Sequence, residues 1–157
     1  MHMHTISGLL HADHRVPTLD YEILLKATLH LTKDVQECEK QFRQMVFNIF
    51  AHNRDDHAKN FSFLMDKNGK WKVSPAYDLT FSSGPVGQHC TTILGEGKNP
   101  TIEHILKIAE MASIKTKRAK EIVDEVRAAV LKWEKFADKA GVAKKSKMAI
   151  WSNISKK

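Results

Sequence analysis

Three polar side chains in the middle of the chain have the types and the spacing of a phosphoryl-transfer site. Asp55 is followed five residues later by Asn60, and Asp78 comes after a further stretch that reads as a hairpin. In protein kinases a catalytic-loop Asp accepts the proton of the substrate hydroxyl, while an Asn five positions on and a later Asp hold Mg²⁺. The spacing therefore indicates magnesium-dependent phosphoryl transfer.

The chemistry assigns a separate role to each side chain. Mg²⁺ takes oxygen ligands, often one or two carboxylates together with substrate phosphates, so Asn60 and Asp78 are the expected metal ligands alongside ATP. Asp55 must stay ionised and off the metal, next to a Ser or Thr hydroxyl whose proton it accepts. His57 and Lys59 belong to the same loop and are expected to contact the phosphates or to fix the loop. The alternative is a polar turn before a strand, where Asn and Asp occur for conformational reasons.

A predicted helix leads directly into the loop that carries these residues. Apolar residues between positions 37 and 51 recur with helical spacing and form one wide stripe. We expect this helix to bury its stripe and to hold the catalytic loop, residues 53–60, rigidly. The stripe consists of Phe42, Met45, Val46, Ile49 and Phe50.

A predicted hairpin follows the loop. Residues 61–65 and 70–74 alternate in polarity around Asn68-Gly69, and Asn-Gly is a strong signal for a tight turn between two strands. The hairpin is expected to carry Asn60 and the metal-binding strand end, residues 75–79, toward one place.

The remaining segments are expected to be mostly helical. A long helix is predicted over 115–139, with Trp133 and Phe136 on its buried side and Gly141 ending it. Residues 148–151 are expected to form a short docking helix or an apolar anchor. Two further helices and one short strand are predicted over 20–31, 101–111 and 90–94 respectively. The fold class is therefore mainly α with a small β-hairpin.

Length and composition favour one compact domain over residues 1–157. With 42% hydrophobic residues the chain can bury one substantial core. Its apolar stretches are short and interrupted by charges, so neither a membrane span nor a signal peptide is expected. Two cysteines form no metal-binding spacing and require no disulfide, and a cytoplasmic protein is the default expectation.

Positive charge is concentrated in a basic tail, residues 115–157. This segment holds 13 Lys or Arg against 5 Asp or Glu, whereas residues 1–114 hold 12 against 13. Such a segment could meet a nucleic acid or an acidic partner. The alternative is a solvated helix face, because acidic and basic residues of this segment interleave at helical spacings. Direct binding to nucleic acid stays open.

The chain from Met45 to Phe81, MVFNIFAHNRDDHAKNFSFLMDKNGKWKVSPAYDLTF, resembles the core signature of the HipA family, the Ser/Thr kinase toxins of bacterial toxin–antitoxin systems. The resemblance covers nearly the first 112 residues. Its flanking motifs are His4-Thr5-Ile6-Ser7, Leu19-Asp20-Tyr21-Glu22, Gln88-His89, Gly95-Glu96-Gly97-Lys98 and Thr101-Ile102-Glu103-His104-Ile105-Leu106.

The resemblance implies a two-lobed kinase distantly similar to the phosphatidylinositol kinases, with ATP and Mg²⁺ as cofactors. It implies that Asp55 is the catalytic base and that Asn60 and Asp78 are Mg²⁺ ligands, with His57 near the nucleotide. Asp56 stands where several members carry a small residue, so no chemistry is assigned to it. The implied partners are a HipB-like antitoxin and a protein substrate, in known members an aminoacyl-tRNA synthetase, in a setting of bacterial persistence.

The resemblance is to the C-terminal lobe alone. The family's N-lobe, with its ATP-binding loop and phosphate-pairing Lys, is expected to be absent, so the chain is expected to be inactive until an N-lobe is supplied in cis or in trans. Two alternatives stay open. One is a non-catalytic kinase remnant that binds protein or RNA, and the other is one half of a split kinase.

Overall fold

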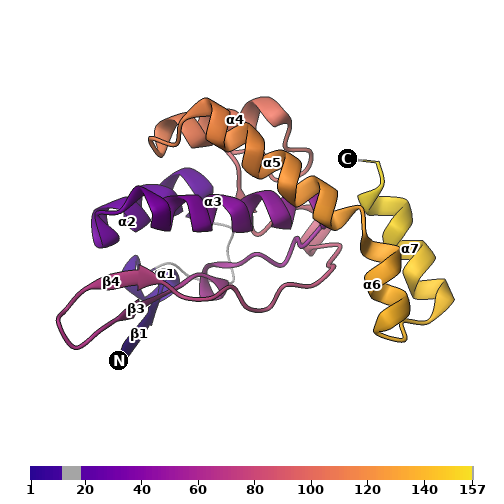
Figure 1. Cartoon of the computed structure of the whole chain (residues 1–157), viewed down its shortest axis with the longest axis horizontal. Coiled ribbons are helices and arrows are strands. Elements are labelled where there is room, and N and C mark those ends of the chain that lie inside the picture. Colours follow the sequence, from indigo (N-terminus) through magenta and orange to yellow (C-terminus); the bar gives the residue numbers. More distant parts are fainter. Residues whose placement is uncertain (12–18, 157) are drawn as a thin grey trace.

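The computed structural model describes residues 1–11 and 19–156, and its centre is the helix α3 (Val35–Phe50). α3 packs against α2 (Tyr21–Thr32) and α5 (Thr116–Val130), and α4 (Ile102–Met111) packs against α5. Figure 1 shows α2 and α3 as one layer, with α4 and α5 on one side of it, a small sheet on the other side, and a separate pair of helices at the C-terminal end. The expected mainly α architecture with small sheets is confirmed.

Both central helices begin at aspartates that cap their first turn. Asp20 Oδ1 accepts a hydrogen bond of 2.8 Å from the backbone N–H of Glu22, and Asp34 Oδ1 accepts one of 2.8 Å from Gln36. Such caps satisfy N–H groups that have no partner within the helix. α2 ends at Lys33, whose left-handed φ of 54° reverses the chain into α3.

The apolar stripe of α3 forms the middle of the core, as predicted. Phe42, Met45 and Val46 have 0% of their surface exposed, and Ile49 has 1%. Burying side chains of this size removes several hundred Å² of apolar surface from water, which stabilises the helix in this position. The C-terminal end of α3 therefore presents the following loop from a rigid base.

The predicted hairpin is present and belongs to a three-stranded antiparallel sheet. Its strands are β3 (Ser62–Met65) and β4 (Trp71–Val73), with Phe63 opposite Val73. β1 (His2–Thr5) pairs with the other edge of β3, so the strand order is β1-β3-β4. A second, parallel pair joins β2 (Leu19–Asp20) to β5 (Thr91–Thr92).

A buried carboxylate fastens the hairpin to α3. Glu37 is 8% exposed, and its Oε2 accepts a hydrogen bond of 2.7 Å from the backbone N–H of Val73. This N–H lies on the edge strand β4, where it has no strand partner in the sheet. The contact orients the hairpin relative to the helix that precedes the catalytic loop.

The prediction of one long helix over 115–139 is wrong. The helix α5 ends at Val130, and a new helix, α6 (Trp133–Lys139), follows and packs with α7 (Lys144–Ile154). Trp133 donates its indole N–H to the backbone oxygen of Lys147 at 3.3 Å, so packing with α7 draws α6 away from the α5 axis. Phe136, expected to be buried, is 55% exposed. Gly141, with φ of 69°, follows α6 as predicted.

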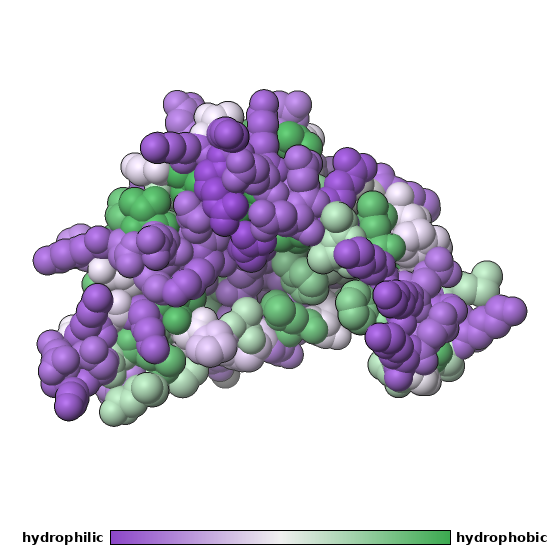
Figure 2. Space-filling model, in the orientation of Figure 1, coloured by the Kyte–Doolittle hydropathy of each residue, from purple (hydrophilic) through white to green (hydrophobic). Residues whose placement is uncertain are grey.

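Ion pairs lie along α5 and join it to α3. Arg118 forms ion pairs with Glu39 at 3.0 Å and with Glu121 at 3.4 Å, and Arg43 of α3 pairs with Glu125 at 2.7 Å. Figure 2 shows a mostly hydrophilic surface over this face, with apolar residues gathered between the main body and the helices α6 and α7. None of the described helices is both long and apolar enough to cross a membrane.

Candidate functional site

The loop after α3 places two neighbouring aspartates in opposite surroundings. Asp55 is exposed, whereas Asp56 has 0% of its surface exposed. A short 3₁₀ turn, η1 (Ala58–Asn60), then leads into the hairpin. An exposed carboxylate can reach a substrate hydroxyl, so this placement is compatible with the proton-accepting role predicted for Asp55.

Asn60 is fixed in a way that leaves its carbonyl oxygen available. Its side chain is buried, at 6% exposure, and its Nδ2 donates a hydrogen bond of 3.0 Å to the backbone oxygen of Asp55. Within residues 1–11 and 19–156, Asn60 Oδ1 makes no hydrogen bond. The donated bond orients the amide, and the remaining oxygen is a suitable ligand for a hard cation.

Asp78 lies in an irregular segment beyond β4 and not at the end of a strand. Its φ of 55° is in the left-handed region, which Asp adopts more readily than most residues. The Nδ2 of Asn53 donates to the backbone oxygen of Asp78 at 3.4 Å, and the N–H of Ser82 donates to the oxygen of His52 at 2.9 Å. These bonds attach the Asp78 segment to the first residues of the catalytic loop.

A tyrosine attaches the same segment to the far end of the loop. The Tyr77 hydroxyl hydrogen-bonds to the backbone oxygen of Lys59 and lies 2.6 Å from the hydroxyl of Ser62. Residues 77 and 78 are thus bonded to both ends of the loop, beside Asn53 and beside Asn60. The structure therefore joins the two predicted metal-ligand segments, as expected from the hairpin.

His57 and Lys59 lie on the same loop in different degrees of exposure. His57 is half-buried, and the Lys59 side chain is exposed. Their predicted contact with a nucleotide stays a prediction.

The donor types of the two predicted metal ligands suit Mg²⁺ better than a transition metal. Nowhere in the described part of the chain do three or more His, Cys, Asp or Glu side chains gather in a manner that could hold a metal ion. One carboxylate and one amide oxygen are an incomplete site by themselves. They suit a hard cation whose other ligands are water and substrate phosphates.

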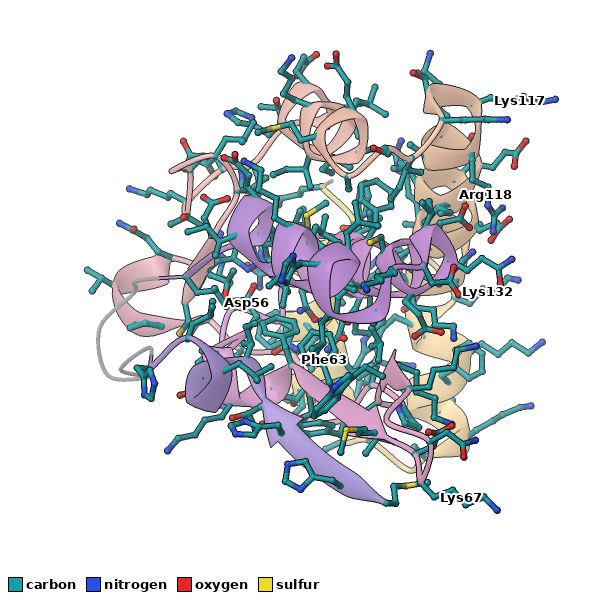
Figure 3. All side chains as sticks on the ribbon, turned by 90° about the vertical axis from the view of Figure 1, so that its left-hand side faces the viewer. Asp56, Phe63, Lys67, Lys117, Arg118 and Lys132 are labelled. Atoms are coloured by element: carbon teal, nitrogen blue, oxygen red, sulfur yellow. The ribbon has the colours of Figure 1, made fainter. Side chains whose placement is uncertain are left out.

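Asp56, to which the sequence pattern assigned no role, accepts four hydrogen bonds through its side chain. Its carboxylate meets Tyr21, His89 and two backbone N–H groups, and Figure 3 shows it on the side of the molecule away from Lys117, Arg118 and Lys132. Its partners lie 33 to 35 residues away along the chain. The sequence feature that could have indicated a supporting role is the pair of adjacent aspartates. Only one carboxylate is needed to accept the substrate proton, so the other is available for a different role.

Burial keeps two groups around the aspartates protonated. Burial, reinforced by the Asp56 charge, raises the pKa of Tyr21 well above its usual range, so its hydroxyl remains a hydrogen-bond donor. Burial and the nearby Asp56 and Asp55 raise the pKa of Cys90 to about 11. The Cys90 thiol lies 3.8 Å from Asp55 Oδ1, so a neutral S–H faces the exposed carboxylate.

Comparisons with known proteins agree with this architecture. The family described as HipA-like C-terminal domain matches residues 1–134. A Haemophilus influenzae protein named "Putative kinase" is 32% identical over 62 residues, which are 39% of this chain and 18% of that protein.

A solved structure gives the same picture of the fold. The HipA, HipB and operator DNA complex of a toxin–antitoxin system from Shewanella oneidensis MR-1 contains a chain that matches with a TM-score of 0.60 and 16% identity. The match covers 71% of this chain and 27% of that chain, so this chain spans only a minor part of the relatives it matches. On the family match over residues 1–134, the chain belongs to the HipA-like C-terminal domain family.

Proposed function

We propose that this chain is the C-terminal lobe of a HipA-like Ser/Thr protein kinase, which transfers the γ-phosphoryl group of ATP to a protein hydroxyl when an N-lobe is supplied. The observation that carries the proposal is the attachment of the Asp78 segment to both ends of the catalytic loop. Asn53 holds one end and Tyr77 holds the other, so the three oxygen groups of the predicted site share one bonded framework.

Each residue of the predicted site has its own part in the proposed reaction. Asp55 accepts the proton of the Ser or Thr hydroxyl, whose oxygen then bonds to the γ-phosphorus. The bond between that phosphorus and the oxygen bridging the β- and γ-phosphates breaks, and ADP leaves with the bonding electrons. Asn60 and Asp78 would hold Mg²⁺, which neutralises charge on the phosphates when bound. Lys59, whose side chain is exposed, would contact a phosphate.

The proposed partners follow from the family and not from contacts in this chain. The Shewanella oneidensis HipA was solved with HipB and operator DNA. A HipB-like antitoxin is accordingly the proposed regulatory partner, and an aminoacyl-tRNA synthetase the proposed class of substrate. Both belong to a proposed bacterial cytoplasmic setting.

Calorimetry with this chain tests the metal and nucleotide part of the proposal. ATP should bind weakly in the presence of Mg²⁺, and Asp78→Asn should lower the affinity about tenfold or more because it removes a carboxylate ligand. Asn is a suitable replacement because it also tolerates the left-handed backbone of this position. Asp124→Asn, an exposed substitution on α5, is the matched control and should bind as the unmodified chain does. Equal affinity for Asp78→Asn and the control would contradict the metal assignment.

A further inference from the structure

Asp56 is a buried acceptor of four hydrogen bonds, whose donors come from two parts of the chain, Tyr21 and residues 89–91. Its Oδ2 lies 2.8 Å from the Tyr21 hydroxyl and 3.0 Å from His89 Nδ1. Its Oδ1 accepts hydrogen bonds from the backbone N–H groups of Cys90 at 2.9 Å and Thr91 at 3.2 Å. The fully buried carboxylate is thereby compensated for its loss of water, which an isolated buried charge is not.

The backbone of the same residue is held as well. The hydroxyl of Thr91 donates to the backbone oxygen of Asp56, so both the side chain and the main chain of this residue are bonded to β5. The residue immediately before it is Asp55, whose carboxylate faces the Cys90 thiol. The position of Asp55 is therefore fixed through its neighbour, because consecutive Cα atoms are joined by a rigid peptide unit.

A line of buried polar side chains extends from Asp56 toward Asp78. The Tyr21 hydroxyl accepts a hydrogen bond of 2.9 Å from Asn48 Nδ2, and Asn48 Oδ1 accepts one of 3.0 Å from Asn53 Nδ2. Asn53 Nδ2 also lies 3.4 Å from the backbone oxygen of Asp78. Networks whose members are all buried rigidify their surroundings, because each broken bond leaves an expensive unsatisfied group.

We propose that Asp56 is a positioning residue of the phosphotransferase site, which through Tyr21, Asn48 and Asn53 fixes the distance between the proton acceptor Asp55 and the metal-ligand segment at Asp78. This inference rests on the proposed function. The two adjacent aspartates then divide the work: Asp55 faces the substrate, and Asp56 holds Asp55 in place. Misplacing a reacting group by about 1 Å can cost on the order of a hundredfold in rate, so such a device has a large effect on catalysis.

The alternative is that Asp56 only stabilises the fold. A purely structural residue and a positioning residue differ in one respect. If Asp56 is purely structural, replacing it lowers nucleotide affinity no more than an equally destabilising substitution elsewhere in the chain does. Loss of a positioning residue displaces the loop and weakens binding beyond that cost.

Nuclear magnetic resonance and calorimetry on this chain separate the two. In Asp56→Asn, an acceptor oxygen facing Tyr21 and His89 is replaced by a donor, so the amide signals of residues 54–60 and 89–92 should shift. The affinity for Mg²⁺-ATP should fall about tenfold or more, as for a lost charged hydrogen-bond partner. Ile122→Ala, at a fully buried site in α5, is the control that lowers stability without touching the loop, and it should leave both quantities unchanged.

A second pair of variants, with smaller changes, tests the proposal if Asp56→Asn does not fold. Tyr21→Phe removes one buried hydroxyl from the network and keeps the ring. Thr28→Val removes one buried hydroxyl from the same helix, where the Thr28 hydroxyl donates to the backbone oxygen of Leu24 and not to the network. Tyr21→Phe should shift the loop signals and weaken Mg²⁺-ATP binding, and Thr28→Val should do neither.

The outcomes are distinct. Unchanged loop signals in Asp56→Asn and Tyr21→Phe would overturn the proposal, as would an equal loss of affinity in Ile122→Ala. Absence of Mg²⁺-ATP binding by the unmodified chain would count against the proposed function instead. The loop signals would still decide whether Asp56 holds Asp55 in place.

Discussion

Replacing Asp56 and, separately, Asp55 by Ala should have very different effects on stability, although the two residues are neighbours. Asp56→Ala leaves four donors without their acceptor: those of Tyr21, His89 and Thr91 are buried, and the N–H of Cys90 is part-buried. Each unsatisfied buried group costs roughly 1–3 kcal/mol. Because water entering the vacated space can satisfy some of these donors, we expect a loss of about 4 kcal/mol.

Asp55→Ala should change stability by only about 0.5 kcal/mol or less, as exposed substitutions commonly do. The Asp55 carboxylate is exposed, and its contact with the Cys90 thiol is long, at 3.8 Å. Urea unfolding followed by circular dichroism at pH 7 measures both changes. Equal slopes of the unfolding free energy against urea concentration would show that the unfolded states of the variants are comparable. A loss below about 1 kcal/mol for Asp56→Ala, or equal losses for the two variants, would refute the reasoning.

Three further predictions concern catalysis, pH and the backbone. In a phosphotransfer assay with an N-lobe supplied, Asp55→Asn should lower turnover by about 10²–10⁴-fold without changing the melting temperature, because it removes the proton acceptor alone. Burial raises the pKa of Cys38 from 9.0 to about 11, so the unfolded chain loses this proton first. The free energy of unfolding should therefore fall between pH 9 and 11, with Cys38 contributing at most about 1.4 kcal/mol per pH unit. Urea titrations at several pH values should show a shallower fall in Cys38→Ala. In thermal unfolding, Gly84→Ala should lower the melting temperature more than Gly69→Ala does. Both glycines have positive φ, but an added Cβ at Gly84 would lie 2.1 Å from a backbone oxygen, whereas one at Gly69 would have no neighbour within 4 Å.

Local sequence patterns were sufficient for the elements around the site. Asp20, at the start of the helix predicted over 20–31, caps α2, and the stripe of α3 is buried as its period predicts, although α3 begins at Val35, two residues before the predicted start. Asn68-Gly69 marks the turn between β3 and β4, with Gly69 at φ of 76°. These features depend on neighbours within about one or two turns, which is the range over which periodicity and turn chemistry act.

Features that depend on distant contacts were missed. The break between α5 and α6 interrupts a continuous apolar pattern because Trp133 bonds to the backbone of Lys147 in α7. β1 joins the hairpin through pairing with residues about 60 positions away. Tertiary packing overrides local preference in both cases, and single-sequence patterns carry little information on such pairings.

The candidate site shows the same division. Asp55, Asn60 and Asp78 were recognised from spacing, and the structure joins their segments by hydrogen bonds. The residues that hold them together, Asp56 and Tyr77, have no recognisable spacing, because their bonds run to partners chosen by the fold. Spacing thus predicted candidate residues whose segments the fold joins, and their chemical roles stay predictions; the residues that support these segments could not be predicted.

The most direct test of the account is to locate a bound metal on this chain. Mn²⁺ with a non-hydrolysable ATP analogue substitutes for Mg²⁺-ATP and broadens the amide signals of nearby residues. The account predicts selective broadening over residues 53–60 and 77–82, with α6 and α7 unaffected, and loss of the effect in Asp78→Asn. Broadening elsewhere, or equal broadening in Asp78→Asn, would contradict the assignment of a phosphoryl-transfer site to this loop.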